Sequence, residues 1–309
     1  MKGLSKVSVK LVEIGSETSG QRVDNFLLRE CKGVPKSHIY RILRSGEVRV
    51  NSGRVDATYK LQDGDRVRIP PLRLGAKAAP SKPPAFDLPL IYEDEGLIAA
   101  NKPAGLAVHG GSGITYGVIE QLRLARPAAK YLELVHRLDR DTSGLLLLAK
   151  KRAVLTAMHE LMRNGQMEKR YLVLVHGHWV AGKQHVKLKL QRYVGGAGER
   201  RVRVDEEGRE SHTVFELKRA CGAYSLLQAQ LKTGRTHQIR VHLAQLGFPI
   251  AGDDKYGDFE LNKRLAKLGL KRMFLHAWKL AFQNPLSGET LKLEAPLPQE
   301  LENFISTLT

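Results

Sequence analysis

One segment divides the chain into two parts, and this constrains the fold more than any other feature. The stretch RLGAKAAPSKPPAFDLP, around residues 73–89, is rich in Ala, Pro and Lys and has no hydrophobic periodicity. Such a composition is typical of a linker between domains. The sequence therefore predicts a small N-terminal domain at residues 1–73, a linker at 74–86 and a larger domain at 87–309.

Charge is the second constraint. The chain has 50 Lys and Arg residues against 32 Asp and Glu, a net charge of +18, while 42% of its residues are hydrophobic, which is enough for a folded core. A surface this basic attracts polyanions, although it can also serve solubility alone. Two cysteines, Cys31 and Cys221, cannot build a disulfide framework or a Cys-rich zinc site, and this usage fits a reducing cytoplasm.

No targeting or membrane segment is expected. The first residues, MKGLSKVSVKLVEIG, lack the apolar stretch of a secretory signal. Even the longest apolar runs, such as Leu145–Ala149, are far shorter than a membrane span. We therefore expect a cytoplasmic protein that has no membrane partner.

The N-terminal domain is predicted to contain two helices and two short strands. Apolar residues three and four apart form one face of each helix: Val23, Phe26 and Leu27, then Ile39, Ile42 and Leu43. Pro35 begins the second helix and Gly46 ends it. The segments Glu47–Asn51 and Arg66–Ile69 alternate as strands do.

The second of these helices is a candidate RNA-binding surface. Residues 1–73 carry fifteen Lys and Arg against eight Asp and Glu, a net charge of +7. Helical spacing places Lys36, Tyr40, Arg41 and Arg44 on one face. A basic helix with an aromatic ring suits the phosphates of folded RNA. A solvated helix face is the plainer interpretation, but it does not explain the concentration of charge.

The larger domain mixes strands and helices. Continuous apolar runs at Gly144–Ala149 and Tyr171–Val175 predict buried strands, and Tyr224–Leu231 also reads as a strand. Thr236–Leu246 has helical spacing and ends at Gly247. The Gly-rich stretch 109–113 lacks the lysine of a phosphate-binding loop, so we interpret it as a flexible loop.

The densest polar cluster, HRLDRDTSG at 136–144, directly precedes a predicted buried strand. A salt-bridged turn is the plainest interpretation. A phosphatase with Asp139 as nucleophile and Asp141 as acid is disfavoured, because Thr142 follows Asp141 directly and no good strand precedes Asp139. A metal site is disfavoured because the flanking arginines would repel a cation. A single catalytic carboxylate that arginines keep ionised fits the local charge best.

Two further clusters complete a known pattern. They are TGRTHQIRVH at 233–242, where a turn opens a helix, and KRY at 169–171, where a tyrosine begins a buried strand. Together with HRLDRDTSG, these segments resemble the pseudouridine synthases of the RluA type, and the N-terminal domain resembles an S4 RNA-binding domain. The resemblance covers nearly the whole chain. It implies an α+β fold, with an S4-like domain and a catalytic domain built on a mixed, mainly antiparallel sheet flanked by helices.

The resemblance also implies roles for individual residues. Asp139 is the essential carboxylate, and Arg240 pairs with it. Tyr171 stacks on the target uracil and is a candidate proton acceptor, Arg137 fills the gap left by the everted uridine, and Ile239 lines the uracil pocket. The residues implied to contact rRNA through the S4 domain are Lys36, Ser37, Tyr40, Arg41 and Arg44.

The implied activity is isomerisation of several uridines near the peptidyl-transferase centre of 23S rRNA, by a monomer that needs neither cofactor nor metal. The partner is 23S rRNA or a precursor of the large ribosomal subunit. A non-catalytic RNA-binding ribosome assembly factor is the main alternative, because charge and the S4-like domain suit it equally well. A nucleoside hydrolase or glycosidase is a further alternative, but Asp141 is too near Asp139 in sequence to flank the bond as the partner acid.

Overall fold

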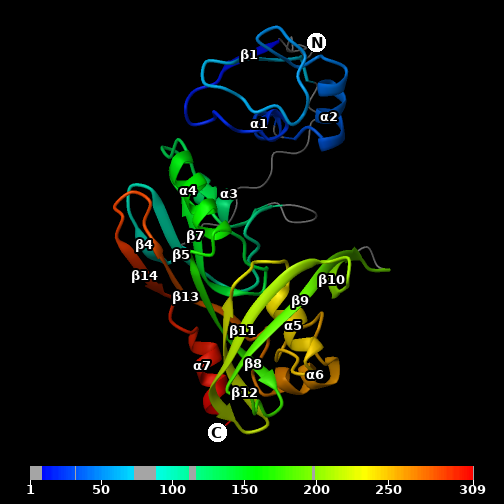
Figure 1. Ribbon diagram of the computed structural model, residues 1–309, viewed down its shortest axis with the longest axis vertical. Coiled ribbons are helices and arrows are strands. Elements are labelled where there is room, and N and C mark those ends of the chain that lie inside the picture. The colour runs from blue at the N-terminus through cyan, green and yellow to red at the C-terminus, as the bar shows by residue number, and fades with distance from the viewer. Residues whose placement is uncertain (1–8, 32, 73–87, 111–115, 197–198, 309) are drawn as a thin grey trace, which may run out of the picture. The chain divides into compact units, whose positions relative to one another are not determined.

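The computed structural model describes residues 9–31, 33–72, 88–110, 116–196 and 199–308. The chain divides into two compact units, Met1–Lys82 and Pro83–Thr309 (Figure 1). The linker expected at 74–86, and residues 111–113 of the expected Gly-rich loop, lie outside the described residues. Within the described ranges, no helix is both long enough and apolar enough to cross a membrane.

The first unit contains the predicted helices and strands. In chain order the elements are β1 (Lys10–Glu13), which the sequence did not predict, α1 (Val23–Glu30), α2 (Lys36–Arg44), β2 (Arg49–Val50) and β3 (Arg66–Ile69). The strands form an antiparallel sheet in the order β1-β3-β2. β2 is shorter than the predicted Glu47–Asn51: it begins at Arg49, and it ends at Val50 because Asn51 and Ser52 turn the chain with left-handed φ angles of 48° and 67°.

The apolar faces of α1 and α2 form the core of this unit. Phe26 and Leu27 of α1 and Ile39 and Ile42 of α2 are almost completely buried in one cluster. Because side chains three and four apart share one helix face, burying this face leaves the opposite face of α2 toward solvent. The helical spacing in the sequence therefore predicts which face of α2 is exposed.

The second unit is built on one large sheet (Figure 1). Its strands in spatial order are β10 (Arg200–Val204), β9 (Lys183–Val194), β11 (Arg209–Cys221), β12 (Tyr224–Leu231), β8 (Glu168–His176), β13 (Leu275–Gln283), β7 (Ser143–Ala149), β5 (Leu97–Lys102) and β4 (Leu90–Glu93). Beside this path, β14 (Thr290–Glu294) pairs with β13 and β6 (Glu133–Leu134) pairs with β7. Among the described strands only β7 and β13 pair in parallel, so the predicted mixed, mainly antiparallel sheet is confirmed.

Strand β7 is buried on both faces, which explains its uninterrupted apolar sequence. Leu146 and Leu148 point to the side covered by α3 (Val118–Ala125), while Leu145 and Leu147 point to the side covered by α4 (Arg152–Arg163). Successive side chains of a strand alternate between the two faces of a sheet, so a strand with helices on both faces needs apolar residues throughout.

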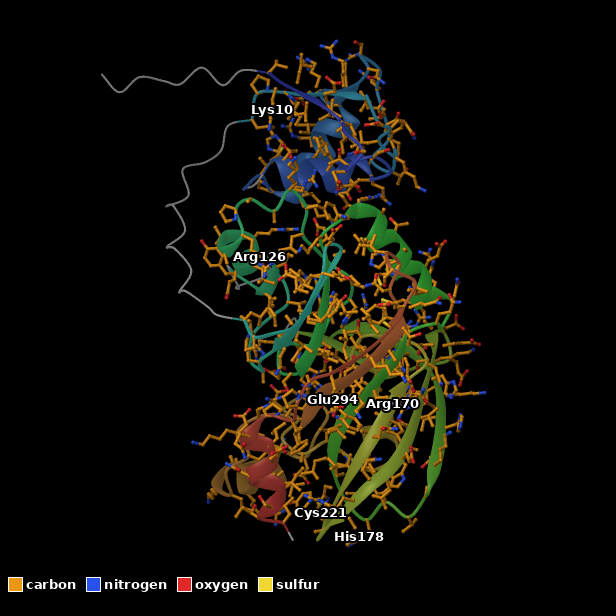
Figure 2. The ribbon with its side chains drawn as sticks, turned by 90° about the vertical axis from the view of Figure 1, so that its left-hand side faces the viewer. Lys10, Arg126, Arg170, His178, Cys221 and Glu294 are labelled. Atoms are coloured by element: carbon orange, nitrogen blue, oxygen red, sulfur yellow. The ribbon has the colours of Figure 1, made fainter. Side chains whose placement is uncertain are left out.

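Three further helices complete this unit: α5 (Gln238–Gln245), α6 (Phe259–Lys267) and α7 (Gln299–Ser306). α6 and α7 bury Leu265 and Phe304 together with Leu174 of β8. Cys221, at the end of β11 (Figure 2), lies in the same cluster. Neither Cys221 nor Cys31 forms a disulfide. α5 begins two residues later than the predicted Thr236–Leu246, because His237 has a left-handed φ of 53°.

The pairing of β7, β13 and β8 brings the HRLDRDTSG and KRY segments of the sequence to one place. Ser143, which begins β7, lies opposite His276 of β13, and the neighbouring Ala277 lies opposite Tyr171 of β8. Gly144 has a φ of 104°, and a Cβ there would collide with the Ala277 carbonyl oxygen. Glycine thus allows β7 and β13 to approach, which sets the turn before β7 beside the start of β8.

Candidate active site

A pocket of about 220 Å³ opens between the turn before β7, the start of β8 and the loop that leads into α5. It is lined by His136, Arg137, Leu138, Asp139, Thr142, Met162, Lys169, Tyr171, Arg192, Leu231, Gly234, Arg235, Thr236, His237, Gln238, Ile239, Arg240 and Leu275. The five catalytic and substrate-binding residues expected from the sequence are all in this lining. Segments more than a hundred residues apart therefore meet at one concave surface.

A buried lysine fixes the turn that carries Asp139. The side chain of Lys102, at the end of β5, is fully buried. Its Nζ donates to the carbonyl oxygens of Pro103, Leu106 and Arg140 at 2.8, 2.8 and 2.9 Å. These acceptors match the three N–H donors of an ammonium group. Because Arg140 follows Asp139 directly, the contact anchors the turn that carries Asp139 to the sheet.

The His136 side chain is hydrogen-bonded to the backbone of β7. Its Nε2 accepts a hydrogen bond from the backbone N–H of Leu147 at 3.1 Å. Burial lowers the pKa of His136 to about 4, so the ring is neutral at neutral pH. Among the described residues, no group of three His, Cys, Asp or Glu side chains is arranged to hold a metal ion.

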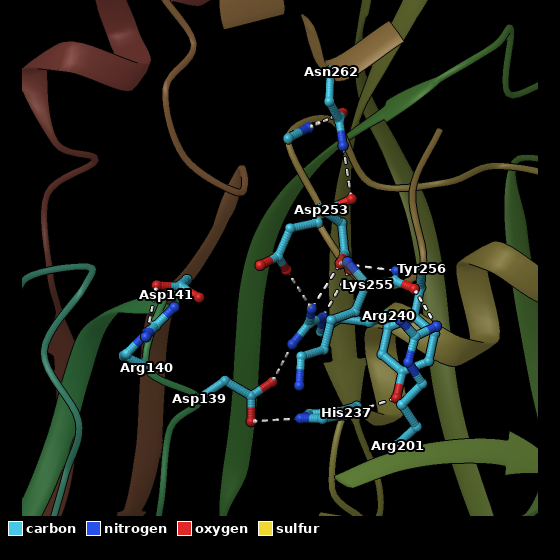
Figure 3. Close-up of polar contacts among 12 residues, drawn as sticks. Asp139, Arg140, Asp141, Arg201, His237, Arg240, Asp253, Lys255, Tyr256 and Asn262 are labelled. Atoms are coloured by element: carbon cyan, nitrogen blue, oxygen red, sulfur yellow. Dashed lines mark hydrogen bonds and ion pairs between the residues drawn. The ribbon is translucent and has the colours of Figure 1, made fainter. Parts of the chain in front are cut away.

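Asp139 contacts Arg240, but Arg240 has a second and closer carboxylate partner. Nη1 of Arg240 lies 3.3 Å from Oδ2 of Asp139 (Figure 3). Its Nε and Nη2 donate to Asp253 at 2.7 and 2.6 Å. Burial alone would lower the pKa of Arg240, but the bonds to Asp253 and the charge of Asp139 raise it above its ordinary value. The guanidinium is therefore charged and fixed in place before any substrate binds.

Asp253 is the buried anchor of this pair. Its side chain is fully buried, whereas that of Asp139 is 25% exposed to the pocket. Burial opposes the charge of Asp253, yet the hydrogen bonds from Arg240 hold its pKa below the ordinary value. One charged guanidinium thus joins a buried carboxylate to a pocket carboxylate, and only the second can reach a substrate.

His237 presents a second polar group to Asp139. Its Nε2 lies 3.9 Å from Oδ1 of Asp139, and its Nδ1 lies 2.8 Å from the hydroxyl of Tyr256. That hydroxyl accepts the backbone N–H of Val202 at 2.8 Å. Burial lowers the pKa of His237. We infer a neutral ring with its proton on Nε2, because Nε2 faces a carboxylate and Nδ1 faces a hydroxyl that can donate.

Tyr171 lies in the sheet with small neighbours on either side. It pairs with Ala229 of β12 and Ala277 of β13, which leave space beside its ring. Burial and the charge of Asp139 raise the pKa of Tyr171, so its hydroxyl stays protonated at neutral pH. A phenolate that accepts a proton is therefore disfavoured at neutral pH.

The expected RNA contacts of the first unit all lie on α2. Four of them are exposed to solvent: Lys36, Ser37, Arg41 and Arg44. Tyr40 is half-buried, and its hydroxyl donates to Asp24 of α1 at 2.8 Å. Its hydroxyl is therefore engaged within the unit, while its ring lies 5.8 Å from Nζ of Lys36. The exposed side of α2 is basic, as its spacing predicts.

Sequence reasoning missed four polar residues of the site: Lys102, His237, Asp253 and Tyr256. The sequence does contain a signal for Asp253 and Tyr256. The stretch GDDKYG at 252–257 places charged residues directly after an apolar segment, as HRLDRDTSG does before one. Asp253 in this stretch pairs with Arg240, which is thirteen residues away, so no local spacing rule connects the two. The role of Lys102 depends on carbonyl positions that only the fold supplies.

Both parts of the chain match known protein families. Residues 96–245 match the family described as RNA pseudouridylate synthase, and residues 21–67 match the S4 domain. The chain belongs to the RNA pseudouridylate synthase family and carries an S4 domain. The resemblance expected from the motifs is thereby confirmed.

Particular relatives are similar along almost the entire chain. The ribosomal large subunit pseudouridine synthase C of Pasteurella multocida is 50% identical, with 97% of this chain and 94% of that protein covered. The protein of the same name from Escherichia coli strain K12 is 49% identical, with 97% of each chain covered. Among solved structures, human RNA Pseudouridylate Synthase Domain Containing 4 has a TM-score of 0.58 and 27% identity, covering 71% of this chain and 92% of that chain.

Proposed function

We propose that this protein isomerises specific uridines of 23S rRNA to pseudouridine, at several sites near the peptidyl-transferase centre, with Asp139 as the catalytic carboxylate. The observation that carries the proposal is the contact of Asp139 with the Arg240 guanidinium in a pocket also lined by Tyr171. The substrate follows from the relatives, which are named as large-subunit pseudouridine synthases.

The reaction explains why one carboxylate is enough. The bond from ribose C1′ to uracil N1 breaks, the base turns, and C1′ bonds to C5, while the proton on C5 is lost and one is gained at N1. No atom or electron is gained or lost overall. A carboxylate can attack C1′ or assist proton loss at C2′, and either role requires the ionised form. A neighbouring guanidinium favours that form.

The pocket also has the groups that an everted base requires. Removing a base from its stack costs a few kcal/mol, which new stacking and hydrogen bonds offset. We assign the ring of Tyr171 to stack on the uracil and Ile239 to contact its edge. Arg137 lines the pocket and is exposed, so its side chain is available to occupy the space the uridine leaves.

The S4 unit supplies affinity rather than chemistry. The exposed basic side of α2 suits rRNA phosphates, which position a protein without reading sequence. We propose that the protein binds 23S rRNA or a large-subunit precursor as a monomer in the cytoplasm. The free thiols of Cys31 and Cys221 fit that compartment. Light scattering measures the molar mass with and without RNA, and we expect one protein chain in each particle in both cases.

The test uses a 23S rRNA transcript labelled with tritium at C5 of uridine. We expect tritium release without loss of base, together with pseudouridine mapped at a few defined positions. Base loss would instead support a hydrolase, and binding without tritium release would support the assembly factor. Mapping pseudouridine in 23S rRNA from a strain that lacks the gene identifies the positions, because only those sites should lose it.

A further inference from the structure

A second hollow adjoins the Asp139 pocket. Its volume is about 360 Å³, and Arg192, Gly234, Arg235 and Thr236 line both spaces. The remaining lining residues are Leu190, Gln191, Val202, Glu207, Gly208 and Arg209. We call this second space the arginine hollow. Because four residues are common to both linings, an RNA strand that leaves the Asp139 pocket on this side enters the arginine hollow directly.

Three arginines reach the hollow from three different segments. Arg209 of β11 lies directly opposite Leu190 of β9, and Arg192 is two residues further along β9. Residues directly opposite in an antiparallel pair, and residues two apart on one strand, share a face of the sheet. Leu190 packs against Val241 of α5 on this face. The loop that precedes α5 adds Arg235 to the same side.

None of these arginines is neutralised by an acidic side chain within the described part of the chain. Nη2 of Arg192 donates to Oγ1 of Thr236 at 2.5 Å, and Nε of Arg235 donates to the Glu210 carbonyl oxygen at 3.1 Å. In the same described ranges, the Arg209 guanidinium has no hydrogen bond or ion pair. Glu207 is the acidic residue of the lining, and it is exposed.

We propose that the arginine hollow binds a backbone phosphate of the nucleotide next to the target uridine. This inference rests on the proposed function, because it places the target base in the adjoining pocket. Each guanidinium retains N–H donors that its present bonds do not use, and a phosphate accepts hydrogen bonds from several donors at once. The hydroxyl of Thr236 is one further donor at the shared wall.

The lining selects a phosphate over a neighbouring base. A single-stranded base is held by stacking on an aromatic ring or on the plane of an Arg guanidinium, and none of the described residues that line the hollow is aromatic. The strongest groups present are the three positive charges. A contact of this kind fixes the path of the RNA next to the site and carries no sequence information of its own.

The discriminating variant is Arg209→Gln, because Arg209 lines the hollow but not the Asp139 pocket. The matched control is Lys218→Gln, which removes one positive charge from an exposed residue near the other end of β11. The substrate is a synthetic 23S rRNA fragment with tritium at C5 of the target uridine. A second set of fragments carries a neutral methylphosphonate at one phosphate on either side of the target.

We expect Arg209→Gln to raise KM by about three- to tenfold with kcat within twofold of wild type, since one charge-assisted contact is lost. The slope of log Kd against log salt should fall by about 0.7, the share of one phosphate contact on a single strand. At one position, a methylphosphonate should weaken the binding of the fragment to wild type and to Lys218→Gln. Arg209→Gln should bind that fragment and the unmodified fragment equally well.

Two results would overturn the inference. The first is an Arg209→Gln variant whose KM and salt slope match those of Lys218→Gln. The second is a methylphosphonate penalty that is equal in Arg209→Gln and in wild type at every position. If the wild-type protein binds the fragment but releases no tritium, the proposed function itself fails, and this outcome is distinct from both.

Discussion

Replacing Asp253 with asparagine should destabilise the catalytic unit and reduce its activity together. Asp253 and Arg240 are both buried, and two bonds of 2.6 and 2.7 Å join them. Breaking one partner of a buried pair costs about 3–5 kcal/mol. Asparagine keeps one acceptor oxygen, and Arg240 keeps Asp139 at 3.3 Å, so we expect the lower end, about 3 kcal/mol.

Tryptophan fluorescence during guanidinium unfolding isolates this effect. Both tryptophans of the chain, Trp179 and Trp278, belong to the second unit, so the signal reports its unfolding and not that of the S4 unit. The control is Glu300→Gln, since Glu300 is 61% exposed in its pair with Arg272 and such pairs contribute about 1 kcal/mol or less.

The stability difference should also depend on pH. The pKa of Asp253 is lower in the fold than in the unfolded chain, where it is about 3.9. Its contribution is therefore complete at neutral pH and is lost as pH falls through the folded pKa. The gap between wild type and Asp253→Asn should shrink below about pH 4. A variant as stable as Glu300→Gln at pH 7 would refute this account of the pair.

Three other perturbations test separate parts of the account. Gly144→Ala forces a Cβ against Ala277 and should cost more than about 2 kcal/mol in the same unfolding assay, whereas no loss would show that the strands can separate freely. Lys102→Met leaves three carbonyl oxygens without donors, which should loosen the turn that carries Asp139. We expect kcat to fall at least tenfold with KM little changed. An unchanged kcat would contradict the anchoring role of Lys102. Deleting residues 1–73 should weaken rRNA binding and reduce the slope of log Kd against log salt in filter binding. A slope equal to that of the full chain would show that the phosphate contacts lie outside residues 1–73.

Local periodicity predicted both helices and two strands of the first unit, and three strands and one helix of the second, but it did not predict the other helices and strands. The motifs predicted which residues meet. The apolar runs at Gly144–Ala149 and Tyr171–Val175 are strands of a sheet with helices on its faces. Asp139 and Arg240 are in contact although about a hundred residues separate them. Periodicity alone could not place them together, because only the family resemblance carried information about tertiary structure.

What the sequence could not supply is the set of partners that the fold assembles. Asp139 was expected as a lone carboxylate beside arginines, but Arg240 is shared with the buried Asp253. Tyr171 was a candidate proton acceptor, yet burial raises its pKa, and burial depends on packing across strands. Lys102 reads as an ordinary lysine in sequence, and only the fold brings three carbonyl oxygens around it.

The most direct test of the central claim is Asp139→Asn, assayed for pseudouridine in 23S rRNA transcript and for rRNA affinity. The substitution removes the charge that faces Arg240 while keeping the shape of the side chain. The account predicts no detectable pseudouridine with binding close to that of wild type. Pseudouridine formation within tenfold of wild type would contradict it, because the reaction would then proceed without the ionised carboxylate.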